Sequence, residues 1–573
     1  MADGHPLFAP ARLGPLHLKN RILMAPMTTR HADKEGFVTD EARLYYQKRA
    51  EGGVGLITVE MAAPEKVGRH RHNELGLYDD KFLDGLRSLV EIIHAEGAKA
   101  SIQIGHGGGH TRQDICGEEP IAPSAVVHSV HEEHTELITP QAMSIERIRQ
   151  TQSSFVAAAV RAKQAGFDAV EIHGAHGYLL SQFLSTVENM RDDDYGGSDQ
   201  NRARFSCEIV RQVKQAVRNL AVIFRMNAED YFEGGMTLDQ AIHMAQWIEQ
   251  AGADAIHVTA GHYRSQPSAA IMIPPMAAGR MPFRAYAKAI KQAVSVPVIS
   301  VGRYGDPQDA KDVIAAGDAD FITLGRPLLA DPDWVRKAEN NEHPRPCIAC
   351  NTCVDGMRDG HKLHCLVNPE TGREKEYHGR ALAMQGARIA VIGAGPAGLT
   401  FASVMADANE VTVFEKRKEV GGSFLLAGHA PKFQTVESRP ETFEFYIQSM
   451  KQICESRGAV LYTNFDPFND PNRLKNFDWI VIAAGAQLPF GLQTSVNVML
   501  KAGLFKISFL KYLASNNKIR DLFYYSLRRP TAKNLMDVLP RGCKVSVIGD
   551  AAQSGKATEA VKSAYDLAYS LHG

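Results

Sequence analysis

Four of the chain's eight cysteines lie in one short stretch, CIACNTCVDGMRDGHKLHC, which spans residues 347–365. Two residues separate Cys347 from Cys350 and Cys350 from Cys353, and eleven separate Cys353 from Cys365. Three thiols at consecutive short intervals plus one remote thiol are typical of ferredoxin-like runs around a [4Fe-4S] cluster. Structural zinc is more often held by two separate Cys-x2-Cys pairs, although nearby loop histidines keep zinc open as an alternative. The spacing therefore favours an iron–sulfur cluster, a carrier of single electrons.

A second motif that can do chemistry is a glycine loop in the stretch ARIAVIGAGPAGLTFASVMADANEVTVFEK. It reads as strand, loop, helix, strand, with Gly393, Gly395 and Gly398 in G-x-G-x-x-G spacing and Glu415 at the end of the second strand. In that context the loop predicts a dinucleotide site, because glycines let the backbone approach a pyrophosphate and the acidic residue reaches a ribose hydroxyl. A merely glycine-rich turn is the alternative.

The elements that must position these motifs begin with a βα alternation between residues 21 and 330. Eight short apolar runs each follow a turn signal and precede a stretch with helical spacing. This is the rhythm of a TIM (β/α)8 barrel, in which the carboxyl ends of the strands carry the chemistry. A doubly wound open sheet is the alternative. The runs are RILMAPMT, VGLITVEMA, KASIQIGH, AVEIH, AVIFRMN, AIHVTA, VPVISVG and DFITLGR.

Length and composition exclude several classes of protein. A chain of 573 residues is long enough for two or three domains. Its 64 basic and 65 acidic residues leave a net charge of -1, so no overall field attracts nucleic acid. The first residues lack the apolar core of a signal peptide, and no segment approaches the ~18 apolar residues of a membrane span. We therefore expect a cytoplasmic α/β protein whose other cysteines are packed thiols rather than disulfides.

These observations predict an order of domains along the chain. We expect a TIM barrel over 1–340, an iron–sulfur segment and linker over 341–380, and a Rossmann-like domain over 385–573. Within the last, the stretch at about 487–542 has no second glycine fingerprint and is too short for a complete nucleotide-binding fold. It is basic and rich in aromatic residues. Such an insert is either a helical cap on the domain or a docking face for an acidic partner or an anionic membrane.

The stretch VEIHGAHGYLLSQFLSTVENMRDDDYGGSDQNRARF, residues 170–205, resembles the strand-4 signature of the Old Yellow Enzyme family of FMN-dependent oxidoreductases. With the cysteine run and the glycine loop, the chain is similar to the longer branch of that family, which contains 2,4-dienoyl-CoA reductase, enoate reductases and trimethylamine dehydrogenase. The resemblance spans nearly the whole chain. It implies FMN in the barrel, a [4Fe-4S] cluster on the four cysteines, and FAD or ADP in the second domain.

The resemblance also implies which residues hold the flavins. Side chains at the ends of strands 1, 2 and 3 would line the FMN ring, and an arginine at strand 5 would place a positive charge beside its pyrimidine edge. Glycines and arginines after strands 7 and 8 would seat the phosphate. In the second domain, an aspartate in a GDA turn would contact the ribityl chain. In chain order these residues are Pro26, Met27, Thr28, Ala62, Gln103, Arg225, Gly302, Arg303, Gly325, Arg326 and Asp550.

For catalysis, the resemblance implies a histidine pair, His173 and His176, that hydrogen-bonds a substrate carbonyl or carboxylate, and a proton donor, Tyr178. Polarising the carbonyl makes the β-carbon electrophilic toward hydride from the flavin, while an acid on the opposite face protonates the α-carbon. His262 resembles a second acid of the dienoyl-CoA reductases. The implied activity is ene-reduction of an α,β-unsaturated carbonyl, enoate or enoyl thioester.

Two other functions stay open. The branch also contains amine dehydrogenases, which pass electrons through the cluster to a protein acceptor. Against that reading, Thr28 stands where trimethylamine dehydrogenase has its flavin-linking cysteine, and no aromatic cage for a cation is evident. The other alternative is a subunit that only relays electrons.

The source of the electrons is also left open by the sequence. The longer relatives that the chain resembles carry a second dinucleotide-binding domain, which docks NAD(P)H against FAD, and only a short stretch stands in its place here. Either NAD(P)H reduces the barrel flavin directly, or a ferredoxin or electron-transfer flavoprotein exchanges electrons through the cluster. We expect a homo-oligomer that contacts neither nucleic acid nor membrane.

Overall fold

The computed structural model describes residues 4–127, 137–433, 436–487 and 542–571, with scattered positions between 498 and 540. The chain divides into two compact units. The first comprises Met1–Glu342 with Cys353–Leu363, and the second comprises His343–Thr352 with His364–Gly573. Each unit is built around its own parallel sheet.

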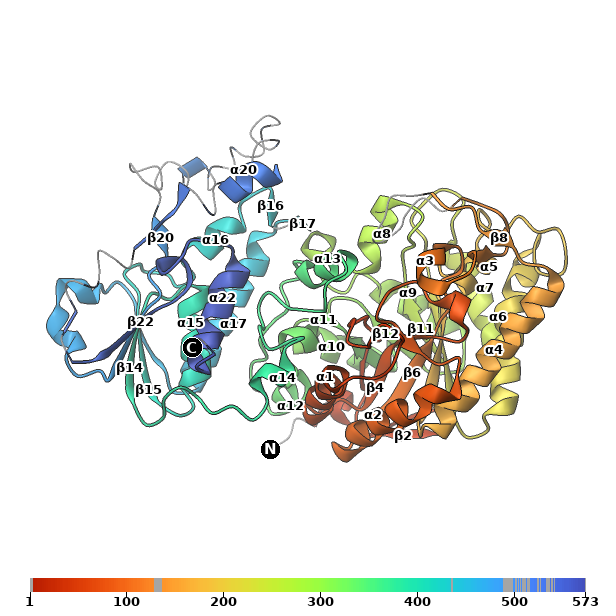
Figure 1. The fold of residues 1–573 in the computed structure, drawn as a ribbon, viewed down its shortest axis with the longest axis horizontal. Helices are drawn as coiled ribbons and strands as arrows, with labels where there is room; N and C mark the ends of the chain where they lie inside the picture. Colours follow the sequence, from red (N-terminus) through yellow and green to blue (C-terminus); the bar gives the residue numbers. More distant parts are fainter. Residues whose placement is uncertain are drawn as a thin grey trace. The chain divides into compact units, whose positions relative to one another are not determined.

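The first unit is a closed barrel of eight parallel strands (Figure 1). The strand β3 pairs with both β13 and β4, which closes the ring. All residues of β4 and β10 are buried, as expected where helices cover a parallel sheet outside and side chains fill it inside. The predicted TIM barrel is confirmed. Its strands are β3 (Ile22–Met24), β4 (Leu56–Ala63), β6 (Lys99–Ile104), β9 (Ala169–Gly174), β10 (Ala221–Asn227), β11 (Ala255–Thr259), β12 (Val298–Val301) and β13 (Phe321–Leu324).

Helices follow the strands and cover the outside of the ring (Figure 1). In α2 the buried side chains Leu86, Leu89 and Ile93 recur at the spacing of an amphipathic helix. At the start of α7, Thr237 and Gln240 form a capping box that satisfies the first backbone N–H groups. The main helices of the barrel are α1 (Asp40–Glu51), α2 (Leu83–Ala95), α4 (Ile145–Gln164), α6 (Asp199–Ala216), α7 (Leu238–Gln250), α9 (Arg284–Ala293), α10 (Pro307–Ala315) and α12 (Trp334–Glu339).

A short hairpin, β1 (Ala11–Leu13) and β2 (Leu16–Leu18), closes the amino-terminal end of the barrel. Its leucines belong to one buried apolar cluster with the first residues of several strands, among them Leu56, Ala169 and Phe321. Burying these side chains stabilises the closed ring through the hydrophobic effect. The carboxyl ends of the strands are therefore the end where a ligand can bind.

The second unit is a Rossmann-like domain, as predicted. Its sheet holds five parallel strands in the order β18, β15, β14, β19 and β22. Helix α15 contacts both α17 and α22 and is buried along nearly its whole length. The strands are β14 (Arg388–Ile392), β15 (Glu410–Phe414), β18 (Val460–Tyr462), β19 (Trp479–Ile482) and β22 (Lys544–Val547), and the helices are α15 (Pro396–Met405), α17 (Pro440–Ser456) and α22 (Ala557–Ala568).

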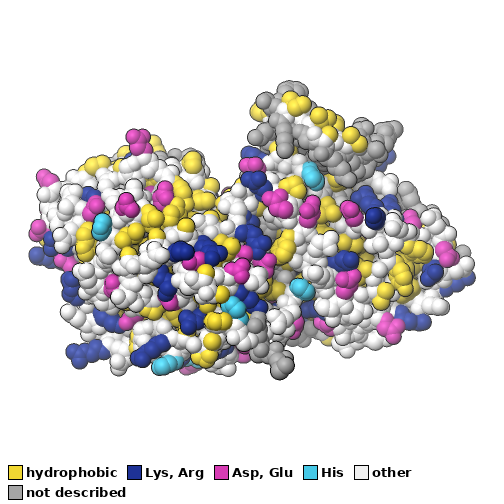
Figure 2. Space-filling view, turned by 180° about the vertical axis from the view of Figure 1, so that it is seen from behind, with side chains coloured by type: hydrophobic (Ala, Val, Ile, Leu, Met, Phe, Trp, Pro, Cys, Tyr) yellow, Lys and Arg dark blue, Asp and Glu magenta, His cyan; other side chains and the backbone are white. Residues whose placement is uncertain are grey.

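Most of the basic insert predicted at about 487–542 lies outside the described residues, so its role as a cap or a docking face stays a prediction. Of the described part, Tyr525 donates a hydrogen bond of 2.9 Å to Glu559 on α22. Among the helices that the structure describes, none is long and apolar enough to cross a membrane. Figure 2 shows acidic and basic side chains interspersed over one face, in keeping with the net charge of -1.

Candidate active site

Buried polar side chains gather at the carboxyl ends of the barrel strands. Arg225 on β10 lies in register with His173 on β9 and with His257 on β11. Gln103 on β6 lies in register with Glu171 on β9. All five side chains are buried. This is the end of the barrel at which the fold class places its chemistry.

Glu171 connects the members of this group. One of its carboxylate oxygens accepts a hydrogen bond from Gln103 Nε2 at 2.7 Å, and the other lies 2.7 Å from His257 Nδ1. Burial raises the pKa of Glu171, but His257, Arg225 and Gln103 together lower it below the usual value. The carboxylate is therefore ionised and orients the donors around it.

Several buried nitrogen atoms at this end of the barrel have no hydrogen-bond partner within the described part of the chain. Among them are Arg225 Nε, His173 Nδ1 and His257 Nε2, which lie on three adjacent strands. Leaving a buried polar atom unsatisfied costs about 1–3 kcal/mol, so native structures rarely do it without a ligand or ordered water. These residues fit the polar edge of a flavin ring, which offers carbonyl oxygens and ring nitrogens.

The predicted catalytic residues come together where β9 ends and the helix α5 (Leu179–Leu184) begins: His173 is in β9, and His176 and Tyr178 are in the turn that joins the two. The His173 ring lies 5.1 Å from the Tyr178 ring and 5.2 Å from the His176 ring. His176 has a left-handed backbone with φ 66°, an unfavourable conformation for a histidine, and its Nε2 lies 3.1 Å from the Thr259 hydroxyl. Burial and the charge of Arg225 lower the pKa of both histidines well below the usual value. Both are therefore neutral hydrogen-bonding groups rather than acids.

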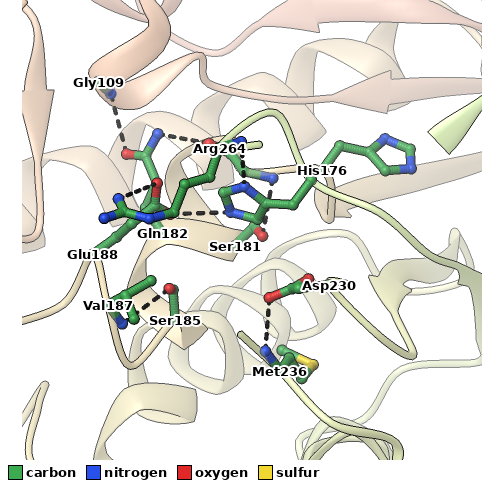
Figure 3. A network of polar contacts seen from close by, with 12 residues as sticks. Gly109, His176, Ser181, Gln182, Ser185, Val187, Glu188, Asp230, Met236 and Arg264 are labelled. Carbon is green, nitrogen blue, oxygen red and sulfur yellow. Dashed lines mark hydrogen bonds and ion pairs between the residues drawn. The ribbon is translucent and has the colours of Figure 1, made fainter. Parts of the chain in front are cut away.

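His262, the predicted second acid, belongs to a separate network. Its Nε2 lies 3.1 Å from a Glu188 oxygen, and its Nδ1 accepts the backbone N–H of Arg264 at 3.0 Å. Figure 3 shows the His176 ring directed away from the network around Glu188 and Arg264. Burial lowers the pKa of His262, but Glu188 and Asp230 outweigh burial and raise it above the usual value. His262 holds its proton toward Glu188, and its part in substrate protonation stays a prediction.

The loop RHRHNE, which follows β4, contributes residues that reasoning from the sequence missed. Arg71 donates hydrogen bonds to the hydroxyls of Tyr178 and Tyr263, both at 3.2 Å, and to Thr28 Oγ1 at 2.9 Å. His70 Nε2 lies 3.2 Å from the Tyr178 hydroxyl. The signal was present in the sequence, because this run of charged residues begins six residues after the end of a barrel strand. A two-residue strand, β5 (Leu75–Gly76), pairs with the end of β4 and holds the loop at the rim.

The predicted flavin-lining residues lie at the same end of the barrel. Pro26, Met27 and Thr28 follow β3 and are partly exposed, whereas Ala62 at the end of β4 is buried. A Cβ atom placed on Gly325 would lie 3.2 Å from the Met27 sulfur, so the loops after the first and eighth strands are adjacent. This adjacency follows from closure of the ring.

The two predicted phosphate-binding arginines converge on one segment. Arg303 donates to the carbonyl oxygen of Met276 at 2.9 Å, and Arg326 donates to that of Pro274 at 2.7 Å. Gly302, just before Arg303, has φ 119°, which a side chain would strain. The structure thus brings two guanidinium groups to the part of the rim that commonly seats a phosphate in this fold.

The glycine loop of the second unit has the geometry of a dinucleotide site. A Cβ atom on Gly398 would lie 1.9 Å from the carbonyl oxygen of Gly393, so only glycine lets the helix pack on the strand. A Cβ atom on Gly395 meets nothing within 4 Å, which leaves open space at the loop. Glu415 accepts the backbone N–H groups of Ala394 and Arg417 at 3.0 and 2.9 Å. The acidic residue therefore lies against the loop.

Asp550, which was predicted to contact the ribityl chain of a flavin, interacts with a residue of the basic insert. It forms an ion pair with Arg528 and accepts the backbone N–H of Gly555 at 3.0 Å. Burial raises the pKa of Asp550 above the usual value even though Arg528 opposes the shift. Its contact with a flavin stays a prediction.

None of the eight cysteines forms a disulfide bond in the structure. In the loop that begins the cysteine run, Ala349 and Asn351 have left-handed backbones with φ 48° and 58°. The Ala349 N–H and the Thr352 hydroxyl donate to the sulfurs of Cys347 and Cys350 at 3.4 and 3.3 Å. Among the residues that the structure describes, no three or more His, Cys, Asp or Glu side chains are arranged to hold a metal ion. The assignment of an iron–sulfur cluster to these cysteines is therefore based on their spacing in the sequence.

Comparison with known proteins places the barrel in a family. Residues 6–344 match the NADH:flavin oxidoreductase / NADH oxidase family. The chain belongs to this family. Residues 391–444 separately match an NAD(P)-binding Rossmann-like domain. The predicted resemblance to the long branch of the Old Yellow Enzyme family is confirmed, and with it FMN as the cofactor expected in the barrel.

Three curated relatives are similar in sequence to most of this chain. An NADH oxidase of Thermoanaerobacter brockii is 40% identical over 74% of this chain and 65% of its own length. A metal reductase of Desulforamulus reducens is 40% identical over 84% of this chain and 70% of its own. A cinnamate reductase of Clostridium sporogenes is 33% identical over 75% of this chain and 67% of its own. The matched part of the chain thus spans about two thirds of these relatives.

One solved structure shares the fold of both units. A complex of 2-naphthoyl-CoA reductase with 2-naphthoyl-CoA covers 99% of this chain and 100% of its own, with a TM-score of 0.86. The two sequences are 23% identical, so this likeness shows a common fold alone.

Proposed function

We propose that this family member is an FMN-dependent ene-reductase acting on an α,β-unsaturated carbonyl, enoate or enoyl thioester. The observation that carries the proposal is the group of His173, His176 and Tyr178 at the rim of the barrel. Two neutral imidazoles suit hydrogen bonds to a carbonyl oxygen, and a tyrosine hydroxyl suits proton donation to carbon. A relative named for the reduction of cinnamate, which is a 2-enoate, supports the substrate class.

Bound FMN would supply the hydride. Arg225 would face the pyrimidine edge of the ring, because its buried Nε is one of the unsatisfied atoms at the strand ends. Gln103, whose side chain donates a hydrogen bond to Glu171, would form a hydrogen bond with the same edge of the ring. Arg303 and Arg326 would hold the phosphate from the loops after the last two strands.

Residues of the chain would bind the substrate carbonyl and supply the proton. His173 and His176 would hydrogen-bond the carbonyl oxygen of the substrate and so increase the positive character of the β-carbon. Tyr178 would deliver a proton to the α-carbon from the opposite side. The intact set of three speaks against a barrel that serves only as a scaffold for electron relay.

Two further cofactors belong to the proposal. We place a [4Fe-4S] cluster on Cys347, Cys350, Cys353 and Cys365 because of their spacing. We place FAD or ADP at the glycine loop beside Glu415; Asp550 is near the loop, because its neighbour Gly549 packs against Ala397. Iron and acid-labile sulfide in the anaerobically purified protein test the first assignment. The nucleotides released on denaturation, separated by chromatography, test the second.

NAD(P)H is the proposed electron donor, and it would act directly at the barrel. A relative named NADH oxidase and the family description support a nicotinamide donor. If the donor were a ferredoxin or an electron-transfer flavoprotein, nicotinamides would leave the flavin oxidised.

Anaerobic stopped-flow spectroscopy of the reconstituted protein tests the function. Rapid bleaching of the flavin by NADH or NADPH, followed by reoxidation with cinnamate, an enone or an enoyl thioester, is the expected result. Bleaching without reoxidation by any of these alkenes would overturn ene-reduction in favour of electron relay. Bleaching by dithionite but by neither nicotinamide would instead point to a protein partner, and methylated amines would then be tested as donors.

A further inference from the structure

We propose that the proton which Tyr178 gives to the substrate is replaced through a relay in which His70 carries the proton and Glu74 orients His70. This inference rests on the proposed function, because ene-reduction consumes one proton at each turnover. Only 5% of Tyr178, 8% of His70 and 3% of Glu74 is exposed. Water therefore has little direct access to the tyrosine, and a route for the proton is needed.

The three side chains form a continuous line of contacts. The Tyr178 hydroxyl lies 3.2 Å from His70 Nε2, and His70 Nδ1 lies 3.0 Å from Glu74 Oε2. The same carboxylate oxygen accepts the backbone N–H groups of His70 and Arg71, at 3.0 and 3.2 Å. Glu74 is thus held against the imidazole by its own loop, and the imidazole is held edge-on to Tyr178, with ring centres 4.9 Å apart.

The charge of Glu74 decides which nitrogen of His70 exchanges protons. Burial raises the pKa of Glu74, but His70 and then Arg71 lower it further than burial raises it, so the carboxyl is ionised at neutral pH. An ionised carboxylate only accepts hydrogen bonds, so His70 Nδ1 carries a hydrogen. Nε2 is then free to accept a proton or to donate one to Tyr178. The same logic orients the histidine of a Ser-His-Asp triad.

Arg71 stabilises the form of Tyr178 that exists between the two proton transfers. Its guanidinium donates to the Tyr178 oxygen at 3.2 Å and to the Tyr263 oxygen at 3.2 Å. A phenolate that accepts hydrogen bonds from a cation is strongly favoured over one that faces apolar side chains. The loop after β4 therefore supplies both the proton and the counter-charge.

The proton passes in two transfers and no electrons move. In the first, the O–H bond of Tyr178 breaks and its proton forms a C–H bond with the carbanion that hydride addition leaves at the α-carbon. In the second, the resulting phenolate takes the Nε2 proton of the His70 imidazolium, whose Nδ1–H stays on Glu74. Neutral His70, of which 8% is exposed against 5% of Tyr178, then takes up one proton from solvent.

Other histidines near Tyr178 are less suited to this task. Burial and Arg225 keep His173 neutral, so it has no spare proton. His262 has both ring nitrogens engaged, with Glu188 and with the backbone of Arg264. His110 lies with its ring centre 6.3 Å from that of Tyr178, beyond the edge-on contact that His70 makes.

The test measures reoxidation of dithionite-reduced holoenzyme in anaerobic stopped flow, with cinnamate or 2-cyclohexenone, whichever reoxidises the wild type faster. His70→Gln keeps a polar side chain but carries no exchangeable acid, so we expect reoxidation by the alkene to slow by about 10²-fold. Reoxidation by dioxygen, which does not use Tyr178 as an acid, should stay at the wild-type rate. In His70→Ala, added imidazole should restore part of the lost rate, which a purely structural role of His70 would not allow.

Two further variants make the outcomes distinguishable. His94→Gln removes another histidine–carboxylate pair, in which Nε2 lies 2.7 Å from Asp168 on the outside of the barrel, and should leave both rates unchanged. If Tyr178→Phe reoxidises with the alkene at the wild-type rate, the acid assigned in the proposed function is wrong. If Tyr178→Phe is slow while His70→Gln stays within about twofold of the wild type, the relay is wrong and the proposed function stands.

Discussion

Alanine at two glycines of the nucleotide loop should separate packing from ligand binding. In Gly398→Ala, the new Cβ atom would lie 1.9 Å from the carbonyl oxygen of Gly393 and 3.1 Å from its carbonyl carbon. A C···O contact of about 3.3 Å would require α15 to move by about 1.4 Å. Because α15 is buried along nearly its whole length, that shift disturbs the whole domain. We expect a loss of about 3 kcal/mol, the upper part of the range for overpacking, and a melting temperature lower by about 6–12 °C.

Gly395→Ala should leave stability unchanged and weaken nucleotide binding. A Cβ atom at Gly395 meets nothing within 4 Å, and the residue has φ -82° and ψ -176°, which alanine adopts without strain. The added methyl group occupies the space through which a pyrophosphate would approach the backbone. We expect affinity for the nucleotide to fall about tenfold or more, equivalent to at least about 1.4 kcal/mol.

Thermal unfolding of the nucleotide-free protein and the nucleotide released on denaturation measure the two effects separately. The expected pattern is a low melting temperature only in Gly398→Ala, with reduced nucleotide content in Gly395→Ala at wild-type stability. Wild-type nucleotide content in Gly395→Ala, or a wild-type melting temperature in Gly398→Ala, would refute the roles assigned to these glycines.

Three further predictions concern the barrel and the cysteine run. Arg225→Ala should lower FMN affinity about tenfold, measured by flavin fluorescence on dilution, because it removes the buried cation with an unsatisfied Nε; the exposed Arg218→Ala is the control. Burial, then Lys362 and Arg49, lower the pKa of His31 to about 4, so the unfolded chain takes up this proton first as the pH falls. His31 therefore contributes full stability above pH ~6.5 and loses on the order of 3 kcal/mol as the pH falls toward 4. In His31→Phe the melting temperature should depend less on pH over that interval, and an equal dependence in both proteins would contradict the reasoning. Cys365→Ser should abolish iron and sulfide incorporation, whereas Cys454→Ser, at a buried cysteine outside the run, should not; equal iron in both would remove Cys365 from the ligand set.

The barrel could be predicted because the pattern that identifies each strand extends over only a few neighbouring residues. A strand that is buried on both faces needs a short, uninterrupted apolar run, and the helix that follows needs an amphipathic stretch. The runs AVIFRMN and AIHVTA became β10 and β11 with nearly the expected bounds. The Rossmann-like unit was predictable for the same reason, since its glycine loop must lie between one strand and the next helix.

Some partners of the site could not be found in this way. His70 and Tyr178 meet across 108 residues of chain, and Glu171 and His257 across 86. No local sequence pattern predicts which loops lie next to each other at the carboxyl end of the barrel. The direction of a side chain is equally hidden, and His262 turned out to face Glu188.

The sequence by itself determined the elements, the order of the two folds and the residues that stand at the strand ends, because hydrophobic periodicity and turn chemistry act over a few residues. Only the tertiary structure decided which of those residues touch. Strands β4 and β9 lie on either side of β6 in the barrel, and this strand order sets His70 and Arg71, in the loop after β4, beside Tyr178. Contacts of that kind depend on the packing of the whole barrel rather than on any one segment.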